Sequence, residues 1–173
     1  HYRDARILPI YEGTTAIQAN DLVFRKTIRD NGAAVNSLLD EIGSEMTALM
    51  NHQNPKIVSA AQNIVEANNT ARNVAAHILG GANTPRRPAT SGSNYLMLLG
   101  TLCGGWLMAR SGAAAADALA KGENGAVGND DFMTIKLNTM QIYMTHHLPK
   151  ISSLARTITD GDGAALAMQP NWL

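Results

Sequence analysis

The sequence has one cysteine, no excess of either charge and few aromatic residues, and each shortage argues against a class of protein. Cys103 stands alone and cannot form an intramolecular disulfide, which is typical of the reducing cytoplasm. The 14 Lys and Arg residues balance 14 Asp and Glu residues in a chain of 173, so no basic surplus supports nucleic-acid binding. We therefore expect a cytoplasmic protein whose partner is a small molecule or another protein.

Long hydrophobic runs are missing as well. The most apolar stretch, residues 95–109, is interrupted by glycines and ends at Arg110, short of the roughly 20 residues that a spanning helix needs. The first residue is His1 rather than Met, and no charged-then-apolar signal pattern follows it. We expect no membrane span, and we expect this chain to be a piece of a longer protein.

Strand patterns are absent, whereas helical patterns are frequent. Aromatic residues make up only 5% of the chain, and no segment sustains the alternation of β-branched and polar residues that a strand requires. Ala, Leu, Met and Ile recur instead at spacings of three and four. The pattern predicts an all-α protein, a bundle of about four long antiparallel helices preceded by a loop and a short helix.

Caps, glycines and prolines predict where these helices begin and end. The short helix starts at Thr14 or Thr15, runs to about residue 26, and is followed by a break at Asn31 and Gly32. The long helices are expected over residues 33–52, 55–80, 94–121 and from about 130 to beyond Pro149, where we expect a kink or a break. Residues 82–93 contain too many helix breakers to be helical, and residues 122–129 are expected to form a linker.

Small residues on the fourth long helix predict a close helix contact. Gly104, Gly105 and Gly112 are followed by four alanines at positions 113–116. Without bulky side chains, this part of the helix would let a neighbouring helix approach its backbone. This is a prediction about packing and not about function.

The common cofactor and catalytic motifs are not found. The sequence contains no glycine-rich phosphate loop, no CxxC pair, no HExxH and no GxSxG. His146 and His147 are adjacent, so on a helix they point in different directions, and with no evident third ligand we expect no metal site. Cys103 lies within an apolar helix, where a free thiol is usually a small buried hydrophobe.

Residues 10–18 combine groups that could do chemistry. Glu12 lies beside Gly13 and Thr14, among apolar residues and just before a helix. Neighbours that exclude water raise the pKa of a carboxyl group and make it a base toward a weakly acidic C–H group. Gly13 permits close approach of a ligand, and Thr14 can bind a ligand or cap the helix. From these residues alone, the favoured interpretation is that Glu12 caps the helix or compensates its dipole.

The first 26 residues resemble a stretch near the C-terminal end of the FAD-dependent acyl-CoA dehydrogenases. The resemblance rests on residues 3–7, on residues 10–14 and on the Ile-Gln pair at 17–18. Three positions depart from the family pattern. Ala16 stands in place of Gln, Ala19 in place of Arg, and Phe24 where the larger subgroup commonly has Gly, so the contacts of the missing Gln and Arg side chains are not carried over.

The resemblance implies a role for each residue of the motif. Glu12 would be the base that removes the α-proton of an acyl-CoA thioester while the β-hydride passes to FAD, forming the trans-2-enoyl-CoA. The backbone N–H of Glu12 would bond the thioester carbonyl and acidify the α-carbon. Tyr11 and Gly13 would line the acyl-CoA cleft, and Thr14 would lie near the FAD.

The rest of the chain is similar to the larger subgroup of these enzymes. Residues 21–26 and 95–110 carry this similarity. The subgroup has an additional C-terminal helical domain, called acetyl-CoA dehydrogenase-like, and includes bacterial enzymes acting on long-chain acyl-CoAs and on the 3-methylmercaptopropionyl thioester. Two parts are implied: residues 1–32 as the C-terminal end of the dehydrogenase helical domain, and residues 33–173 as the additional bundle.

The resemblance also shows what the chain would need from elsewhere. The family's N-terminal helical domain and middle β-domain, which hold most of the FAD, are not in these residues. We therefore expect a C-terminal fragment that is inactive alone, whose parent is a homo-oligomer and passes electrons to an electron-transferring flavoprotein. The alternative hypothesis is a non-catalytic assembly or interaction module whose exposed apolar helix faces make the contacts.

Overall fold

The computed structural model is an all-α bundle and describes residues 2–8, 10, 14–84, 86–125 and 130–169. Three short elements come first: α1 (Tyr2–Ala5), α2 (Thr15–Asn20) and the π-helix η1 (Asp21–Ile28). The long helices follow: α3 (Ala33–Leu49), α4 (Pro55–Gly80), α5 (Arg86–Ala120), α6 (Phe132–His146) and α7 (Lys150–Ala167). No strand occurs in these described ranges, and the predicted fold class is confirmed.

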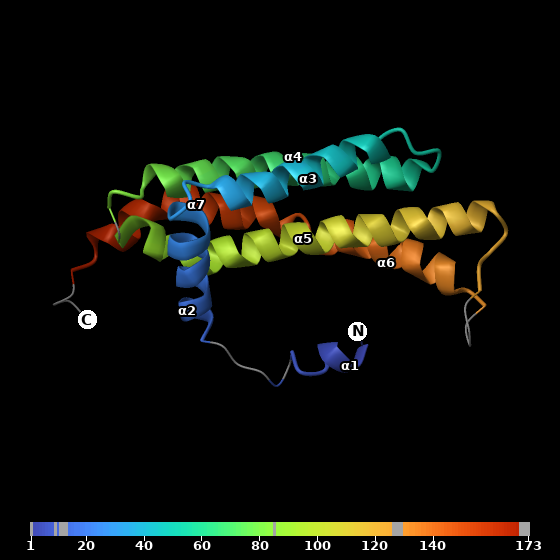
Figure 1. Ribbon diagram of the computed structural model, residues 1–173, viewed down its shortest axis with the longest axis horizontal. Helices are drawn as coiled ribbons and strands as arrows, with labels where there is room; N and C mark the ends of the chain where they lie inside the picture. Colours follow the sequence, from blue (N-terminus) through green and yellow to red (C-terminus); the bar gives the residue numbers. More distant parts are fainter. Residues whose placement is uncertain (1, 9, 11–13, 85, 126–129, 170–173) are drawn as a thin grey trace.

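The longest helix, α5, organises the bundle. Figure 1 shows α5 extending along most of the bundle. The paired helices α3 and α4 run alongside it, and α2 crosses one end. α5 packs against α6 and α7 most extensively, and it also contacts α2, η1, α3 and α4. None of the helices in the described part of the chain, α5 included, has the length and hydropathy of a membrane span.

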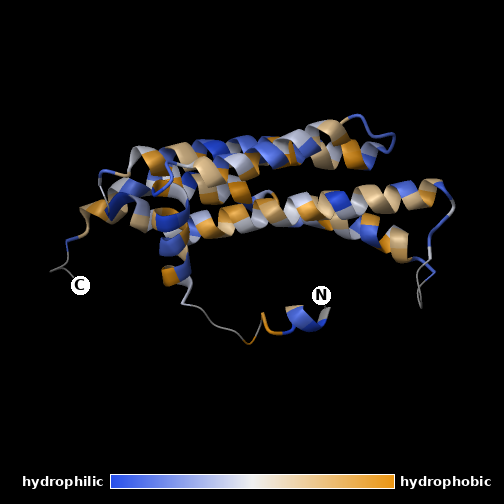
Figure 2. Cartoon of the chain, in the orientation of Figure 1, coloured by the Kyte–Doolittle hydropathy of each residue, from blue (hydrophilic) through white to orange (hydrophobic). Residues whose placement is uncertain are grey.

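The core consists of aliphatic side chains that all the long helices contribute. Their spacing of three and four residues places them on the inner face of each helix, while hydrophilic residues follow the outer side of α3 and α4 (Figure 2). The largest fully buried side chains include Leu39, Ile42, Met46, Ile57, Ile64, Ile78, Leu98, Leu102, Met140, Ile151 and Ile158. Tyr95 is equally buried, and its hydroxyl lies 3.3 Å from the hydroxyl of Thr27 on η1.

Glycines of α5 let α6 pack directly against the α5 backbone. A methyl group added at Gly104 would overlap the Tyr143 hydroxyl, and one added at Gly112 would overlap the sulfur of Met140. The Tyr143 hydroxyl uses this space to donate a hydrogen bond of 3.0 Å to the carbonyl oxygen of Thr101. The predicted close approach of a neighbouring helix is therefore confirmed.

Several helix ends follow the predicted signals. Asn31 and Gly32 have φ angles of 53° and 81°, the left-handed backbone that separates η1 from α3. Asn54 caps α4 by accepting a hydrogen bond of 3.0 Å from the N–H of Lys56. The chain breaks between α6 and α7 at Pro149, as expected.

The two predicted connections differ in outcome. The prediction that residues 82–93 are non-helical is wrong for residues 86–93, because α5 begins at Arg86. Pro88 is tolerated because it is the third residue of the helix, where its missing N–H removes no intrahelical bond. Gly92 packs closely on α2, since a Cβ there would lie 3.3 Å from Cβ of Ala19. Of the linker at 122–129, only residues 122–125 are described, and they are non-helical.

Replacing Gly104 with Ala is expected to lower the free energy of unfolding by about 1–3 kcal/mol, because the added methyl displaces the Tyr143 ring and its hydrogen bond. Gly100 is the matched control, because it lies one turn away in α5 with nothing within 4 Å of an added Cβ. Gly100→Ala should raise the free energy of unfolding by up to about 1 kcal/mol through helix propensity. Denaturant titration of both variants measures these effects, and similar effects would mean that the Tyr143 contact does not limit packing.

Candidate functional site

The predicted site falls largely outside the described residues. Tyr11, Glu12 and Gly13 are not among them, so the roles predicted for these three residues stay predictions. Thr14 is exposed and occupies the N-cap position of α2, where its carbonyl oxygen accepts the N–H of Ile17 over 2.9 Å. Its hydroxyl makes no capping hydrogen bond.

The segment that flanks the motif carries exposed apolar side chains. Ile10 and Ile17 are both exposed, and Figure 1 shows α2 leading away from the long helices. Ala19 is the exception, because it is buried against Gly92 of α5. This contact explains one departure from the family pattern: the close approach of α5 leaves no room for an arginine at position 19.

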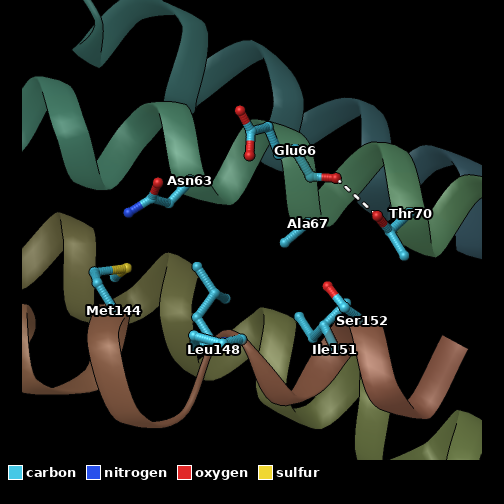
Figure 3. A pocket seen from close by; sticks show the side chains of 9 residues that line it. Asn63, Glu66, Ala67, Thr70, Met144, Leu148, Ile151 and Ser152 are labelled. Carbon is cyan, nitrogen blue, oxygen red and sulfur yellow. Dashed lines mark hydrogen bonds between the residues drawn. The ribbon is translucent and has the colours of Figure 1, made fainter.

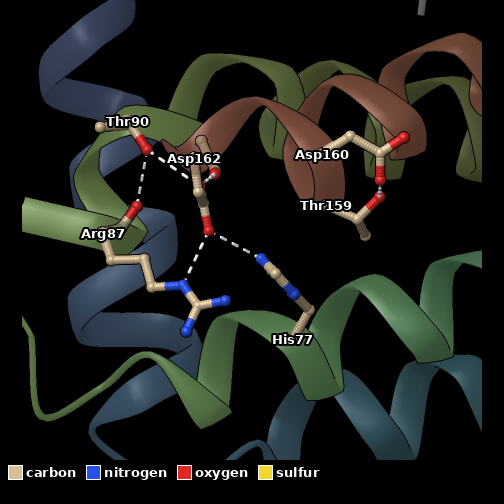
Figure 4. A network of polar contacts seen from close by, with 7 residues as sticks. His77, Arg87, Thr90, Thr159, Asp160 and Asp162 are labelled. Carbon is tan, nitrogen blue, oxygen red and sulfur yellow. Dashed lines mark hydrogen bonds and ion pairs between the residues drawn. The ribbon is translucent and has the colours of Figure 1, made fainter. Parts of the chain in front are cut away.

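A polar cluster joins α4, α5 and α7 near the end of the bundle that α2 crosses (Figure 4). Asp162 of α7 lies at its centre. Its Oδ2 accepts hydrogen bonds of 2.8 Å from both His77 Nε2 and Arg87 Nε. Its Oδ1 lies 3.1 Å from the hydroxyl of Thr90 and 3.2 Å from the hydroxyl of Ser91. Sequence reasoning missed this cluster because His77 and Asp162 are separated by 85 positions, with no motif linking them.

The electrostatics of the cluster suit a structural role. Burial alone would raise the pKa of Asp162, but the hydrogen bonds from Arg87, His77, Thr90 and Ser91 outweigh it and hold that pKa below its ordinary value. A carboxylate has about four lone-pair sites, and all are directed at donors here. Asp162 is therefore a poor base with no free site for a substrate proton.

A half-open cavity of about 320 Å³ lies between α4 and the junction of α6 with α7 (Figure 3). Met144 and Leu148 form an apolar side, while Asn63, Glu66 and Ser152 bring polar groups to the wall. The volume is that of a small-ligand pocket. The cavity does not include Thr14 or Asp162, and it pairs no nucleophile with a base, so it carries no catalytic assignment.

His147 and Cys103 make packing contacts in the bundle. The His147 ring stacks on Tyr143 with 5.1 Å between ring centroids. Within the described ranges, no group of three or more potential metal ligands comes together. Cys103 is partly buried against the core, and burial raises the pKa of its thiol, which therefore stays protonated near neutral pH.

Comparison with known sequences gives the class of protein to which this all-α bundle belongs. The chain belongs to the acetyl-CoA dehydrogenase C-terminal-like family, whose model matches residues 35–169. The resemblance to the C-terminal part of acyl-CoA dehydrogenases is thus confirmed.

Two curated relatives carry the comparison further. The chain is 41% identical over 172 residues to 3-methylmercaptopropionyl-CoA dehydrogenase of Ruegeria pomeroyi, a match covering 96% of this chain and 28% of that protein. It is 31% identical over 166 residues to the broad-specificity linear acyl-CoA dehydrogenase FadE5 of Mycobacterium tuberculosis, covering 91% of this chain and 26% of that protein. The chain therefore spans little more than a quarter of the length of these relatives.

Replacing Asp162 with Asn is expected to lower the free energy of unfolding by about 1–3 kcal/mol, because the partly buried Arg87 and His77 donors lose their charged acceptor. Asp160 is the matched control on the same helix. Its side chain is 68% exposed and lies 3.8 Å from Arg156, so Asp160→Asn should change stability by less than about 0.5 kcal/mol. Guanidinium titration compares the two, and equal losses would contradict a structural role specific to Asp162.

The same cluster should make stability depend on pH in the acidic range. Because the fold lowers the pKa of Asp162, its contribution is fully present above the unfolded value of about 3.9 and is lost as pH falls through the folded pKa. Unfolding titrations from about pH 6 down to pH 3 should therefore show a smaller acid loss for Asp162→Asn than for the wild type. Parallel curves for the two proteins would contradict this assignment.

Proposed function

We propose that the chain is the C-terminal part of a FAD-dependent acyl-CoA dehydrogenase that converts an acyl-CoA to the trans-2-enoyl-CoA, with Glu12 as the α-proton base. The supporting observation is the extent of the match to 3-methylmercaptopropionyl-CoA dehydrogenase. The match covers 96% of the chain. The few residues that it leaves out do not reach as far as Tyr11, Glu12 and Gly13, so the match includes these three residues. Both relatives are named as acyl-CoA dehydrogenases, which supports the same reaction class for the parent protein.

The proposed chemistry of this chain is proton abstraction. The Glu12 carboxylate takes the proton of the α-C–H bond, whose electron pair becomes part of the new double bond as the β-hydrogen leaves with its pair. The backbone N–H of Glu12 holds the thioester carbonyl, which stabilises the charge that develops on that oxygen. Tyr11 and Gly13 line the acyl-CoA cleft. A bound acyl chain excludes water from Glu12 and so raises its pKa toward the working pH.

Thr14 fits a contact with the flavin. Its hydroxyl is exposed, stands at the start of α2 and makes no capping hydrogen bond within the chain. FAD, when bound, supplies the acceptor for the β-hydride. The remaining contacts with FAD are proposed to come from the upstream part of the parent, so the isolated chain is expected to be colourless and inactive.

The proposal divides the chain at residue 32. Residues 1–32 would complete the dehydrogenase, and residues 33–173 would form the additional bundle, a division supported by the start of the family match at residue 35. α2 and η1 nevertheless pack on α5, so the two parts share a core. We further propose a cytoplasmic homo-oligomer that passes electrons to an electron-transferring flavoprotein.

Glu12→Gln in the full-length parent is expected to slow flavin reduction by acyl-CoA about 10²- to 10⁴-fold, because glutamine keeps the shape of the side chain and removes the base. Anaerobic stopped-flow absorbance at the flavin band measures this rate. Flavin content should be unchanged, and Glu41→Gln, at an exposed position of α3, should reduce at the wild-type rate. Near wild-type reduction in Glu12→Gln would place the base on another residue.

A further inference from the structure

Large apolar side chains are exposed in only a few places on this molecule. Nine are exposed among the described residues, and all but Met168 fall into two groups with exposed fractions between 48% and 75%. The first, the N-terminal apolar group, consists of Ile7, Leu8, Ile10 and Ile17. The second, the α5–α6 outer face, consists of Met97 and Leu107 on α5 with Ile135 and Ile142 on α6.

The α5–α6 outer face is also poor in charge. From Pro88 to Ala109, α5 has no charged residue, and α6 has Lys136 as its only Lys, Arg, Asp or Glu residue. The other long helices differ, because α3, α4 and α7 each carry acidic side chains, and no large apolar side chain is exposed on the described parts of these three helices. A helix facing water normally carries charge on its outer side, so α5 and α6 have the composition of covered helices.

The α5–α6 outer face is carried by two helices that pack directly against each other. α5 and α6 are held together through Gly104 and Gly112, so their outer sides adjoin. Gly100 is exposed on α5 between Met97 and Leu107, and nothing lies within 4 Å of a Cβ placed there. Another chain segment can therefore approach the backbone of α5 at this point.

We propose that the upstream part of the same polypeptide covers both the N-terminal apolar group and the α5–α6 outer face. This inference rests on the proposed function, in which this chain follows a dehydrogenase core. The relatives are more than three times as long as the region they share with this chain, which leaves a body large enough to cover both surfaces. The bundle would then be fixed to the core at two places rather than hanging from a single connection.

The placement of the two groups favours this occupant over a second copy of the chain. The N-terminal apolar group adjoins the proposed catalytic segment, so the dehydrogenase core is within its reach. A single neighbouring body accounts for both exposed groups, whereas a second copy seated on α5 and α6 would leave the N-terminal group unexplained.

The test uses the full-length parent with a cysteine at position 142. If the outer face is covered, Ile142→Cys should react with a maleimide at least about tenfold more slowly than Ala76→Cys, a control at an exposed position of α4. Mass spectrometry assigns the label to each position and separates it from Cys103. Equal rates would show an open face and overturn the proposal.

A charged variant distinguishes a face covered by the same polypeptide from a face covered by a second copy of the chain. Ile142→Asp should leave the molecular mass of the oligomer unchanged in light scattering, because the proposed contact lies within one polypeptide. A fall to half the mass, absent in Ala76→Asp, would assign the face to a second copy and overturn the proposal. Ile135→Asp repeats the test two turns away if the first variant does not fold. The flavin reduction rate of Glu12→Gln is a separate result, so failure of the catalytic assignment can be recognised independently.

Discussion

Direct contact between the α5 backbone and side chains of α6 is the constraint on which the rest of the bundle depends. α5 is the helix that touches nearly every other element, and its small residues set how near its neighbours lie. Tyr143 and Met140 occupy the space that larger residues at Gly104 and Gly112 would fill. Close packing of this kind fixes the position of α6, and through it the site at which the chain turns into α7.

Much of the fold could be predicted from local signals, since periodicity and caps act over a few residues. The Asn54 cap, the left-handed backbone at Asn31 and the break at Pro149 are of this kind. The start of α5 could not be, because local composition does not reveal tertiary contacts such as the close packing of Gly92 on Ala19 of α2. Local composition shows that a glycine lowers the stability of a helix, but it does not show the packing neighbour that restores this stability.

The two sites differ in what the sequence reveals of them: one is visible as a motif, and the other is not. Tyr11, Glu12 and Gly13 are contiguous and form a motif, so sequence predicts them while the described residues leave their geometry open. The Asp162 cluster has well-defined geometry and no motif, because its groups come from three helices far apart in the chain. Its saturated carboxylate identifies it as a structural element, a conclusion that requires coordinates.

The Asp162 cluster can be completed only after α7 has been synthesised. A chain emerges from the ribosome N-terminus first, so α4 and α5 are available to fold before α7 exists. Until α7 follows, His77 and Arg87 lack their common acceptor, and the apolar faces that α7 covers stay open to water. A bundle truncated before Asp162 would therefore leave His77 and Arg87 without their acceptor and would leave uncovered the apolar faces of α4 and α5 against which α7 packs.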